Sequence, residues 1–175
     1  MIEGALVRLR LWQEDDVPAI MALRNDVALQ AKLLARARGS DQSQVRKWLE
    51  DRSTAAGNML FIVAQSSNDA PLGYLQFTGI DPVDLNAELG ICLATAAQGR
   101  GFGGEALQLA LSHLRDTVGI RKISLRVRTD NTVAIRAYRR LGFSKCGELK
   151  DHIFIDGRWQ NVLLMELFLQ SSSSQ

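Results

Sequence analysis

Four glycines within seven consecutive residues, at positions 98–104, are the most distinctive chemical feature of the sequence. An apolar, strand-like run precedes the segment, and residues with helical spacing follow it. Glycine lets a ligand approach the backbone closely, and free amides at a helix N-terminus bind anions such as pyrophosphate. The segment therefore predicts a phosphate cradle, with a flexible turn as the alternative. Its members are Gln98, Gly99, Arg100, Gly101, Phe102, Gly103 and Gly104.

Two common phosphate-binding motifs do not fit these glycines. A P-loop continues with Lys and then Ser or Thr after its last glycine, whereas Glu105 and Ala106 stand here. A dinucleotide-binding fingerprint follows the first strand of a parallel unit, but the strands predicted before this segment form an antiparallel meander. The pattern thus argues against triphosphate chemistry and against NAD or FAD.

A second segment, residues 131–143, places Asn131, Ala134 and Tyr138 on a predicted helix that ends before Gly142 and Phe143. This segment is similar to the N-x-x-A-x-x-x-Y-x-x-x-G-F signature of the GNAT superfamily of N-acetyltransferases. The glycine segment resembles that family's Q/R-x-x-G-x-G/A motif. The resemblance covers nearly the whole chain and implies acetyl-CoA as co-substrate, an amine as acceptor and direct attack of the amine on the thioester.

The resemblance also implies which residues bind acetyl-CoA. The glycine segment would hold the pyrophosphate, and Asn131 would touch the cofactor arm, although Asn131 also fits a plain helix N-cap. Members of the family splay two neighbouring strands and offer backbone groups there to the pantetheine arm. In this sequence the strand residues at that place are Ile91, Cys92 and Leu93.

Two residues are predicted to move protons. Tyr138 matches the position from which a phenol, with an ordinary pKa of about 10, can protonate the departing thiolate; the alternative is a buried aromatic with a satisfied hydroxyl. Glu88 is the predicted base, directly or through water, because an amine arrives mostly protonated at neutral pH; the alternative is a surface carboxylate. Arg126 stands where the ribosomal-protein branch is expected to carry Glu, which argues against a peptide N-terminus as acceptor.

The identity of the acceptor stays open. Residues 23–26 and 77–90 look like the branch that acetylates nucleotide-linked amino sugars, whereas residues 147–157 are similar to polyamine and ribosomal-protein acetylating members. Amino-sugar nucleotides, polyamines, aminoglycosides and protein N-termini all remain candidates. The alternative class is a non-catalytic coenzyme A-binding module, or an enzyme that uses a longer acyl donor. The presence of Tyr138 beside the complete loop argues against the module.

These residues must be positioned by a mixed α/β (α+β) fold, in which a mostly antiparallel sheet with a splayed strand pair carries flanking helices. Helices are predicted at 14–25, from Ser40 or Asp41 onward, 103–118 and 131–141, with weak helical character at 26–39. Gly142 is expected to close the last helix in a left-handed conformation. Strands are predicted at 5–11, 59–64, 72–77, 87–94, 122–128, 145–154 and 159–169.

The composition indicates one domain over residues 1–170, followed by a disordered tail at 171–175. The 175 residues are 46% hydrophobic and 23% charged, and 21 Lys and Arg against 19 Asp and Glu leave a net charge of +2. This near-neutral balance gives no support to nucleic-acid binding. The N-terminus lacks the pattern of a signal peptide and no apolar run could span a membrane, so we expect a cytoplasmic location without membrane association.

The remaining residues of interest receive structural interpretations. Cys92 and Cys146 lie in strand-like segments and are expected to be buried free thiols. His113 and His152 are isolated, so no metal site is predicted. Three tryptophans are expected in the core or the acceptor pocket, and arginines at 136, 139 and 140 form a solvated face or reach the 3′-phosphate. An exposed final strand and the habit of the family favour a homodimer.

Overall fold

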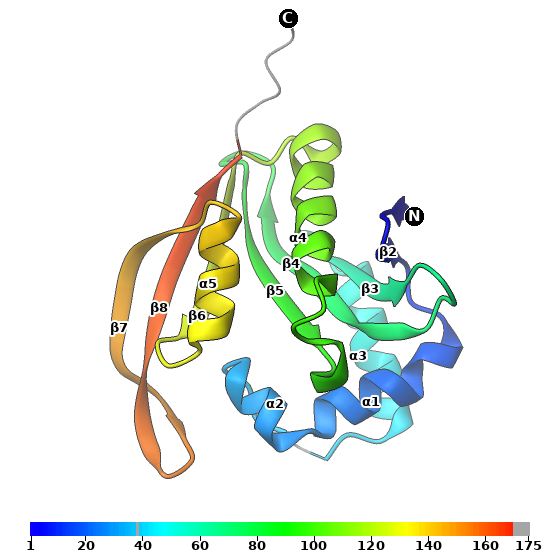
Figure 1. The fold of residues 1–175 in the computed structure, drawn as a ribbon, viewed down its shortest axis with the longest axis horizontal. Coiled ribbons are helices and arrows are strands. Elements are labelled where there is room, and N and C mark those ends of the chain that lie inside the picture. The colour runs from blue at the N-terminus through cyan, green and yellow to red at the C-terminus, as the bar shows by residue number, and fades with distance from the viewer. Residues whose placement is uncertain (38, 170–175) are drawn as a thin grey trace, which may run out of the picture.

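The computed structural model describes residues 1–37 and 39–169, and these form one eight-stranded sheet with helices on both faces (Figure 1). The strand order is β1-β2-β3-β4-β5-β6-β8-β7, and all neighbours are antiparallel except β5 and β6. The strands are β1 (Ile2–Glu3), β2 (Val7–Arg10), β3 (Met59–Gln65), β4 (Pro71–Asp81), β5 (Asn86–Leu93), β6 (Lys122–Arg128), β7 (Ser144–Ile155) and β8 (Arg158–Phe168). The predicted mixed, mostly antiparallel sheet is confirmed.

The helices begin and end close to the predicted places. A 3-10 turn, Glu14–Asp16, leads into α1 (Val17–Asn25), and a π turn, Leu114–Val118, extends α4 (Phe102–His113). Residues 26–39, whose pattern was weak, contain a short helix capped by the Asp26 carboxylate, which accepts the Leu29 N–H at 2.9 Å. The α-helices are α1 (Val17–Asn25), α2 (Val27–Lys32), α3 (Gln42–Thr54), α4 (Phe102–His113) and α5 (Thr132–Arg140).

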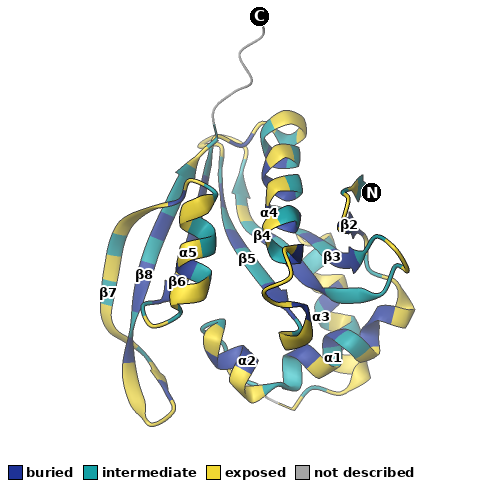
Figure 2. Ribbon diagram, in the orientation of Figure 1, coloured by how far each residue is buried: buried dark blue, intermediate teal, exposed yellow. Residues whose placement is uncertain are grey.

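Alternation along the strands separates two hydrophobic cores, one on each face of the sheet. On one face, Leu107 and Ala110 of α4 pack with Val63 and Leu75 of the central strands. On the other, Ile20 of α1 and Leu49 of α3 pack with Ile62, Tyr74 and Cys92. The inward sides of these helices are accordingly buried, whereas most of the outward side of α5 is exposed (Figure 2). Two helix layers therefore cover one sheet.

The parallel strands β5 and β6 pair over only three residues. Their register runs from Asn86 opposite Lys122 to Glu88 opposite Ser124, although β5 continues to Leu93 and β6 to Arg128. Beyond Glu88 the two strands diverge toward their C-terminal ends, between α4 and α5 (Figure 1). This is the predicted splayed pair, and it leaves backbone groups of β5 without a neighbouring strand on that side.

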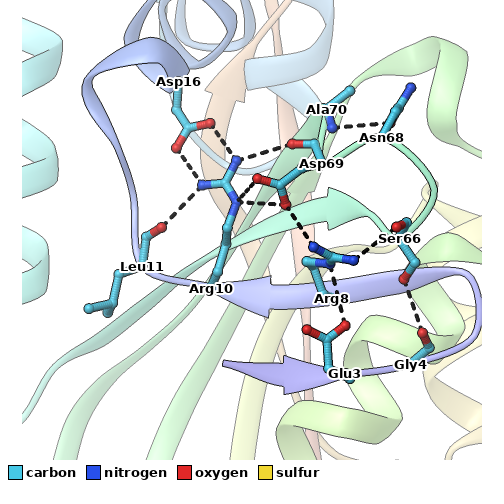
Figure 3. Close-up of polar contacts among 10 residues, drawn as sticks. All are labelled: Glu3, Gly4, Arg8, Arg10, Leu11, Asp16, Ser66, Asn68, Asp69 and Ala70. Carbon is cyan, nitrogen blue, oxygen red and sulfur yellow. Dashed lines mark hydrogen bonds and ion pairs between the residues drawn. The ribbon is translucent and has the colours of Figure 1, made fainter.

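A buried ion pair fixes the start of α1 against the sheet (Figure 3). Arg10 of β2, which is only 4% exposed, donates to both carboxylate oxygens of Asp16 at 2.7 and 2.9 Å. Asp16 also accepts the Gln13 N–H, and Arg10 reaches Asp69 in the turn between β3 and β4. The network thus ties one edge of the sheet to the segment from which α1 begins.

Several predictions about single residues need correction. Cys92 is buried as predicted, but Cys146 is exposed because it lies on the edge strand β7. Trp159 is also exposed, at 59%, and packs only edge-on against Phe154. The final strand β8 is not an edge, since it lies between β6 and β7. The predicted tail, residues 171–175, lies outside the described residues.

Candidate active site

One large groove, with a volume of about 1340 Å³, passes through the opening between β5 and β6. Residues from both faces of the sheet line it: glycines at the start of α4 and one side of α5 on one face, and α1, α2 and α3 on the other. A pocket for one drug-sized ligand typically measures about 300–1,000 Å³. The groove is thus large enough for two ligands that meet at the splayed strands.

The glycine segment forms one end of the groove. Gly99, Gly101, Gly103 and Gly104 line it, and α4 begins directly after Gly101, which has a left-handed φ of 85°. Such a φ favours glycine. A Cβ built on Gly99 or Gly104 would meet nothing within 4 Å, so these positions face open space. The first N–H groups of α4 lack partners within the helix and make this end suitable for an anion.

Glu105 holds a neighbouring loop against the glycine segment. Its carboxylate accepts the N–H groups of Ala5, Leu6 and Val7 at 3.0, 2.7 and 2.7 Å. Leu6 itself lines the groove, and its Cδ1 lies 3.3 Å from where a Cβ of Gly101 would be. Three donors on one carboxylate compensate its charge, so an acidic residue is tolerated beside the predicted phosphate cradle.

Helix α5 supplies Asn131 and Tyr138 to the groove wall. Asn131 is the N-cap of α5, and its side-chain oxygen accepts the Ala134 N–H at 3.3 Å, in keeping with the capping interpretation. The Tyr138 ring packs edge-on against Phe143 at 5.8 Å. Burial raises the pKa of Tyr138 to about 12. The phenol is therefore protonated at neutral pH and can donate its proton.

Glu88 and Arg126 face each other where β5 and β6 begin to part. The Arg126 Nε donates to a carboxylate oxygen of Glu88 at 2.9 Å, and both side chains line the groove. Glu88 is thus paired with Arg126 at the groove wall.

The opposite end of the groove carries polar and aromatic side chains from three elements. The guanidinium of Arg24, from α1, lies 4.3 Å over the ring of Trp48, from α3. Tyr74 and Gln76 project from alternate positions of β4, and Arg52 adds a second guanidinium from α3. Burial lowers the pKa of Arg24 and raises that of Tyr74. This end is suited to a polar small molecule.

The groove collects most of the predicted site residues. Ile91, Cys92, Leu93, Gln98 and Asn131 line it with Glu88, Tyr138 and the four glycines. Two are not among the lining residues: Phe102 is buried in the core at 5% exposure, and the Arg100 guanidinium lies 5.0 Å over the Phe102 ring. Burial raises the pKa of the Cys92 thiol to about 12, so this thiol is not a nucleophile at neutral pH.

Sequence reasoning missed Arg24, Arg52, Gln76 and Glu105 as residues of the groove. A usable signal existed for Gln76 alone, because Tyr74, Gln76 and Thr78 alternate with apolar residues on one strand. Arg24 and Arg52 look like ordinary helix-surface arginines in the sequence.

Within residues 1–37 and 39–169, no three His, Cys, Asp or Glu side chains gather in a way that could hold a metal ion. In the same residues, no helix is long and apolar enough to cross a membrane.

Comparison with models of known families assigns this chain to a family. The family model described as an acetyltransferase (GNAT) domain matches residues 7–144. This match spans most of the chain and both motif segments up to Phe143. The chain therefore belongs to the GNAT acetyltransferase family, and the resemblance drawn from its glycine segment and Tyr138 helix is confirmed.

Individual proteins are similar to this chain at moderate or low sequence identity. Spermidine N(1)-acetyltransferase of Escherichia coli K12 is 34% identical over 96 residues, which are 55% of this chain and 52% of that protein. The Vibrio cholerae protein of the same name is 32% identical over 111 residues, 63% of each chain. The alignments thus cover about half to under two thirds of these relatives. L-methionine sulfoximine/L-methionine sulfone acetyltransferase of Pseudomonas aeruginosa is 24% identical over 162 residues, 91% of this chain and 92% of that protein.

Solved structures show the same fold. The crystal structure of Vibrio cholerae spermidine N-acetyltransferase in complex with CoA and spermine has a TM-score of 0.87 at 23% identity. The superposition covers 94% of this chain and 96% of the other. At this identity the similarity establishes the fold of the sheet and helices.

Proposed function

We propose that this protein transfers the acetyl group of acetyl-CoA to a primary amine of a small molecule. The observation that carries the proposal is one continuous groove with a glycine-lined helix N-terminus at one end, polar side chains at the other, and Tyr138 in the wall. Family membership supports the same chemistry. The amine nitrogen bonds to the thioester carbonyl carbon, the carbon–sulfur bond breaks, and coenzyme A leaves.

In this proposal the chain binds acetyl-CoA mainly through its backbone. The free N–H groups at the start of α4 face the pyrophosphate, as the lining glycines allow. The pantetheine arm lies along residues 91–93 of β5, where β6 has diverged and backbone groups are open to a ligand. Arg136 and Arg140, which line the groove from α5, are available for the remaining phosphate.

Two side chains then account for the protons. Tyr138 donates its hydroxyl proton to the departing sulfur, and its raised pKa means that the phenol is protonated at neutral pH before the reaction. The attacking nitrogen gives up its proton through water to Glu88, which then releases it to solvent, and Tyr138 is reprotonated from solvent. The net reaction converts amine and thioester into amide and thiol without a covalent enzyme intermediate. The buried Cys92 thiol takes no part.

The acceptor is a separate question, because the relatives are named for different acceptors. Two are named for spermidine, another for L-methionine sulfoximine and L-methionine sulfone, and a fourth, from Escherichia coli, for the serine of a ribosomal protein. We therefore propose a small primary amine as the acceptor. One domain, a cytoplasmic location and a homodimer stay predictions.

Tyr138→Phe tests the proposal. With a panel of primary amines, wild-type protein should release thiol from acetyl-CoA, and the variant should lose about 10²-fold or more in kcat. Acetyl-CoA should still raise the Tm of the variant, because the phenol hydroxyl is not part of the predicted binding contacts. Acetyl-CoA binding without turnover of any amine by wild-type protein would instead identify a coenzyme A-binding module.

A further inference from the structure

Two arginines at the polar end of the groove lack acidic partners. Among the described residues, neither Arg24 nor Arg52 forms an ion pair or a side-chain hydrogen bond, although both line the groove. Some other arginines pair with carboxylates, Arg10, Arg46 and Arg126 among them. These two guanidiniums come from different helices, α1 and α3. Two unpaired positive charges are therefore directed into one cavity.

Arg24 is partly buried, and no carboxylate of the described residues pairs with its charge. Its Nε is buried and has no hydrogen-bond partner, and burial and the nearby Arg52 both lower its pKa. Its guanidinium stacks on Trp48, which leaves the in-plane N–H groups free. A buried charge is costly unless it is paired, and the planar guanidinium fork matches a carboxylate. The surroundings of Arg24 are therefore suited to binding an anion.

Gln76 adds an uncharged polar side chain to this end of the groove. Its side-chain oxygen is buried and has no hydrogen-bond partner. Gln76 lies two residues after Tyr74, the β4 residue that interacts electrostatically with Arg24, and a two-residue step along a strand spans about 7 Å. Gln76 and Arg24 therefore belong to the same end of the groove.

The charge of the groove opposes a polycationic acceptor. Six basic side chains line it, and both acidic ones already have partners: Glu88 pairs with Arg126, and Glu105 accepts three backbone N–H groups. A polyamine needs free carboxylates and would instead meet two unpaired arginines. The basic residues are Arg24, Lys32, Arg52, Arg126, Arg136 and Arg140.

We infer that the acceptor is a small amine that carries a carboxylate beside its amino group, as an α-amino acid does. Arg24 and Arg52 bind the carboxylate, and the amino group lies on the side of Gln76, which lines the groove. This inference rests on the proposed function and narrows its acceptor. Such an acceptor differs from spermidine, which carries no carboxylate.

Matched pairs of substrates test the inference. The protein is assayed with α-amino acids and with the corresponding amino-acid amides, which lack the carboxylate. Spermidine and glucosamine 6-phosphate serve as the polycationic and the phosphate-bearing amines. We expect kcat/KM for the best acid to exceed that for its amide at least tenfold. The amide's amine loses its proton more readily, so a preference for the acid must come from binding.

Variants locate the carboxylate site. Arg24→Gln and Arg52→Gln should each raise KM for the acid about tenfold or more, with little change for the amide, and Arg24→Lys should recover part of the loss. Arg46→Gln is the matched control, because Arg46 lies on the same helix as Arg52 but pairs with Glu14 outside the groove. The Tm rise produced by acetyl-CoA should be the same in all four variants.

Several outcomes would overturn the inference while acetyl transfer stands: equal use of acid and amide, or preference for spermidine or glucosamine 6-phosphate. If no amine is acetylated, the proposed function fails separately, and binding still decides the inference. In that case an N-acetyl amino acid, with coenzyme A present, should raise the Tm of wild-type protein but not that of Arg24→Gln. No difference between the two proteins would contradict the carboxylate site.

Discussion

Glu88 contacts Arg126 across the diverging strands, and this contact permits two roles for the carboxylate. As a base it would receive the proton of the attacking amine. As a structural group it would only keep β5 and β6 in register at the point where pairing ends. The pair is exposed enough that its contribution to stability is small, so kinetics rather than stability distinguishes the two roles.

A comparison of Glu88→Gln with Arg126→Gln makes that distinction. If Glu88 accepts the proton, Glu88→Gln should lower kcat about 10²-fold, and Arg126→Gln should retain most of it, because it leaves the carboxylate intact. Rates are measured under saturating acetyl-CoA, with the Tm of each variant as a check on folding. Equal losses in the two variants would assign the pair a structural role and leave the base to solvent.

At the scale of elements, α1 depends on the buried pair between Arg10 and Asp16 (Figure 3). Both side chains are almost completely buried, and Asp16 immediately precedes α1, which carries Arg24 into the groove. Removal of one partner leaves an uncompensated buried charge, whereas removal of both does not. The pair therefore links stability at the sheet edge to the position of the polar end of the groove.

Arg10→Met should lower the free energy of unfolding by about 3–5 kcal/mol, as measured by urea denaturation. The double variant Arg10→Met, Asp16→Leu should lose distinctly less, because no buried charge remains unpaired. Arg46→Gln, which breaks an exposed pair with Glu14, should change stability very little. A double variant at least as unstable as Arg10→Met would show that the pair is not the cause.

The elements that sequence could predict are those whose residues repeat with a clear period. The apolar face of α4 and the alternation in β4 and β8 are such cases, and the glycine segment and Tyr138 helix were predictable from fixed local spacing. Arg24 and Arg52 could not be predicted as site residues, because their role depends on which helices meet over Tyr74. Cys146 was misjudged because alternation alone does not distinguish an edge strand from a central one.

At the scale of the whole molecule, the buried neutral groups predict sensitivity to alkali. Burial raises the pKa of Cys92 from 9.0, and that of Tyr138 from 10.0, each to about 12, and it also raises that of Tyr74. A pKa that is higher in the folded state favours folding below the unfolded value, and this stabilisation is lost as pH rises through the folded value. Stability should thus fall between about pH 9 and pH 12.

Urea denaturation across that pH range measures the effect. The free energy of unfolding should decline steadily for wild-type protein, and the decline should be shallower for Tyr138→Phe, which keeps the ring but removes one titrating group. A constant free energy of unfolding from pH 9 to pH 12 would contradict the burial of these groups in solution.

The most direct test of the account is whether acetyl-CoA binds at the start of α4. Gly101 precedes this helix and Gly119 ends its π extension, and both have left-handed φ values, of 85° and 80°. Asn tolerates that conformation, so Gly101→Asn and Gly119→Asn form a matched pair in which only Gly101 lines the groove. Calorimetric titration should show acetyl-CoA binding to wild-type protein and Gly119→Asn, and at least tenfold weaker binding to Gly101→Asn. Equal affinity in all three proteins would contradict the assignment of the groove.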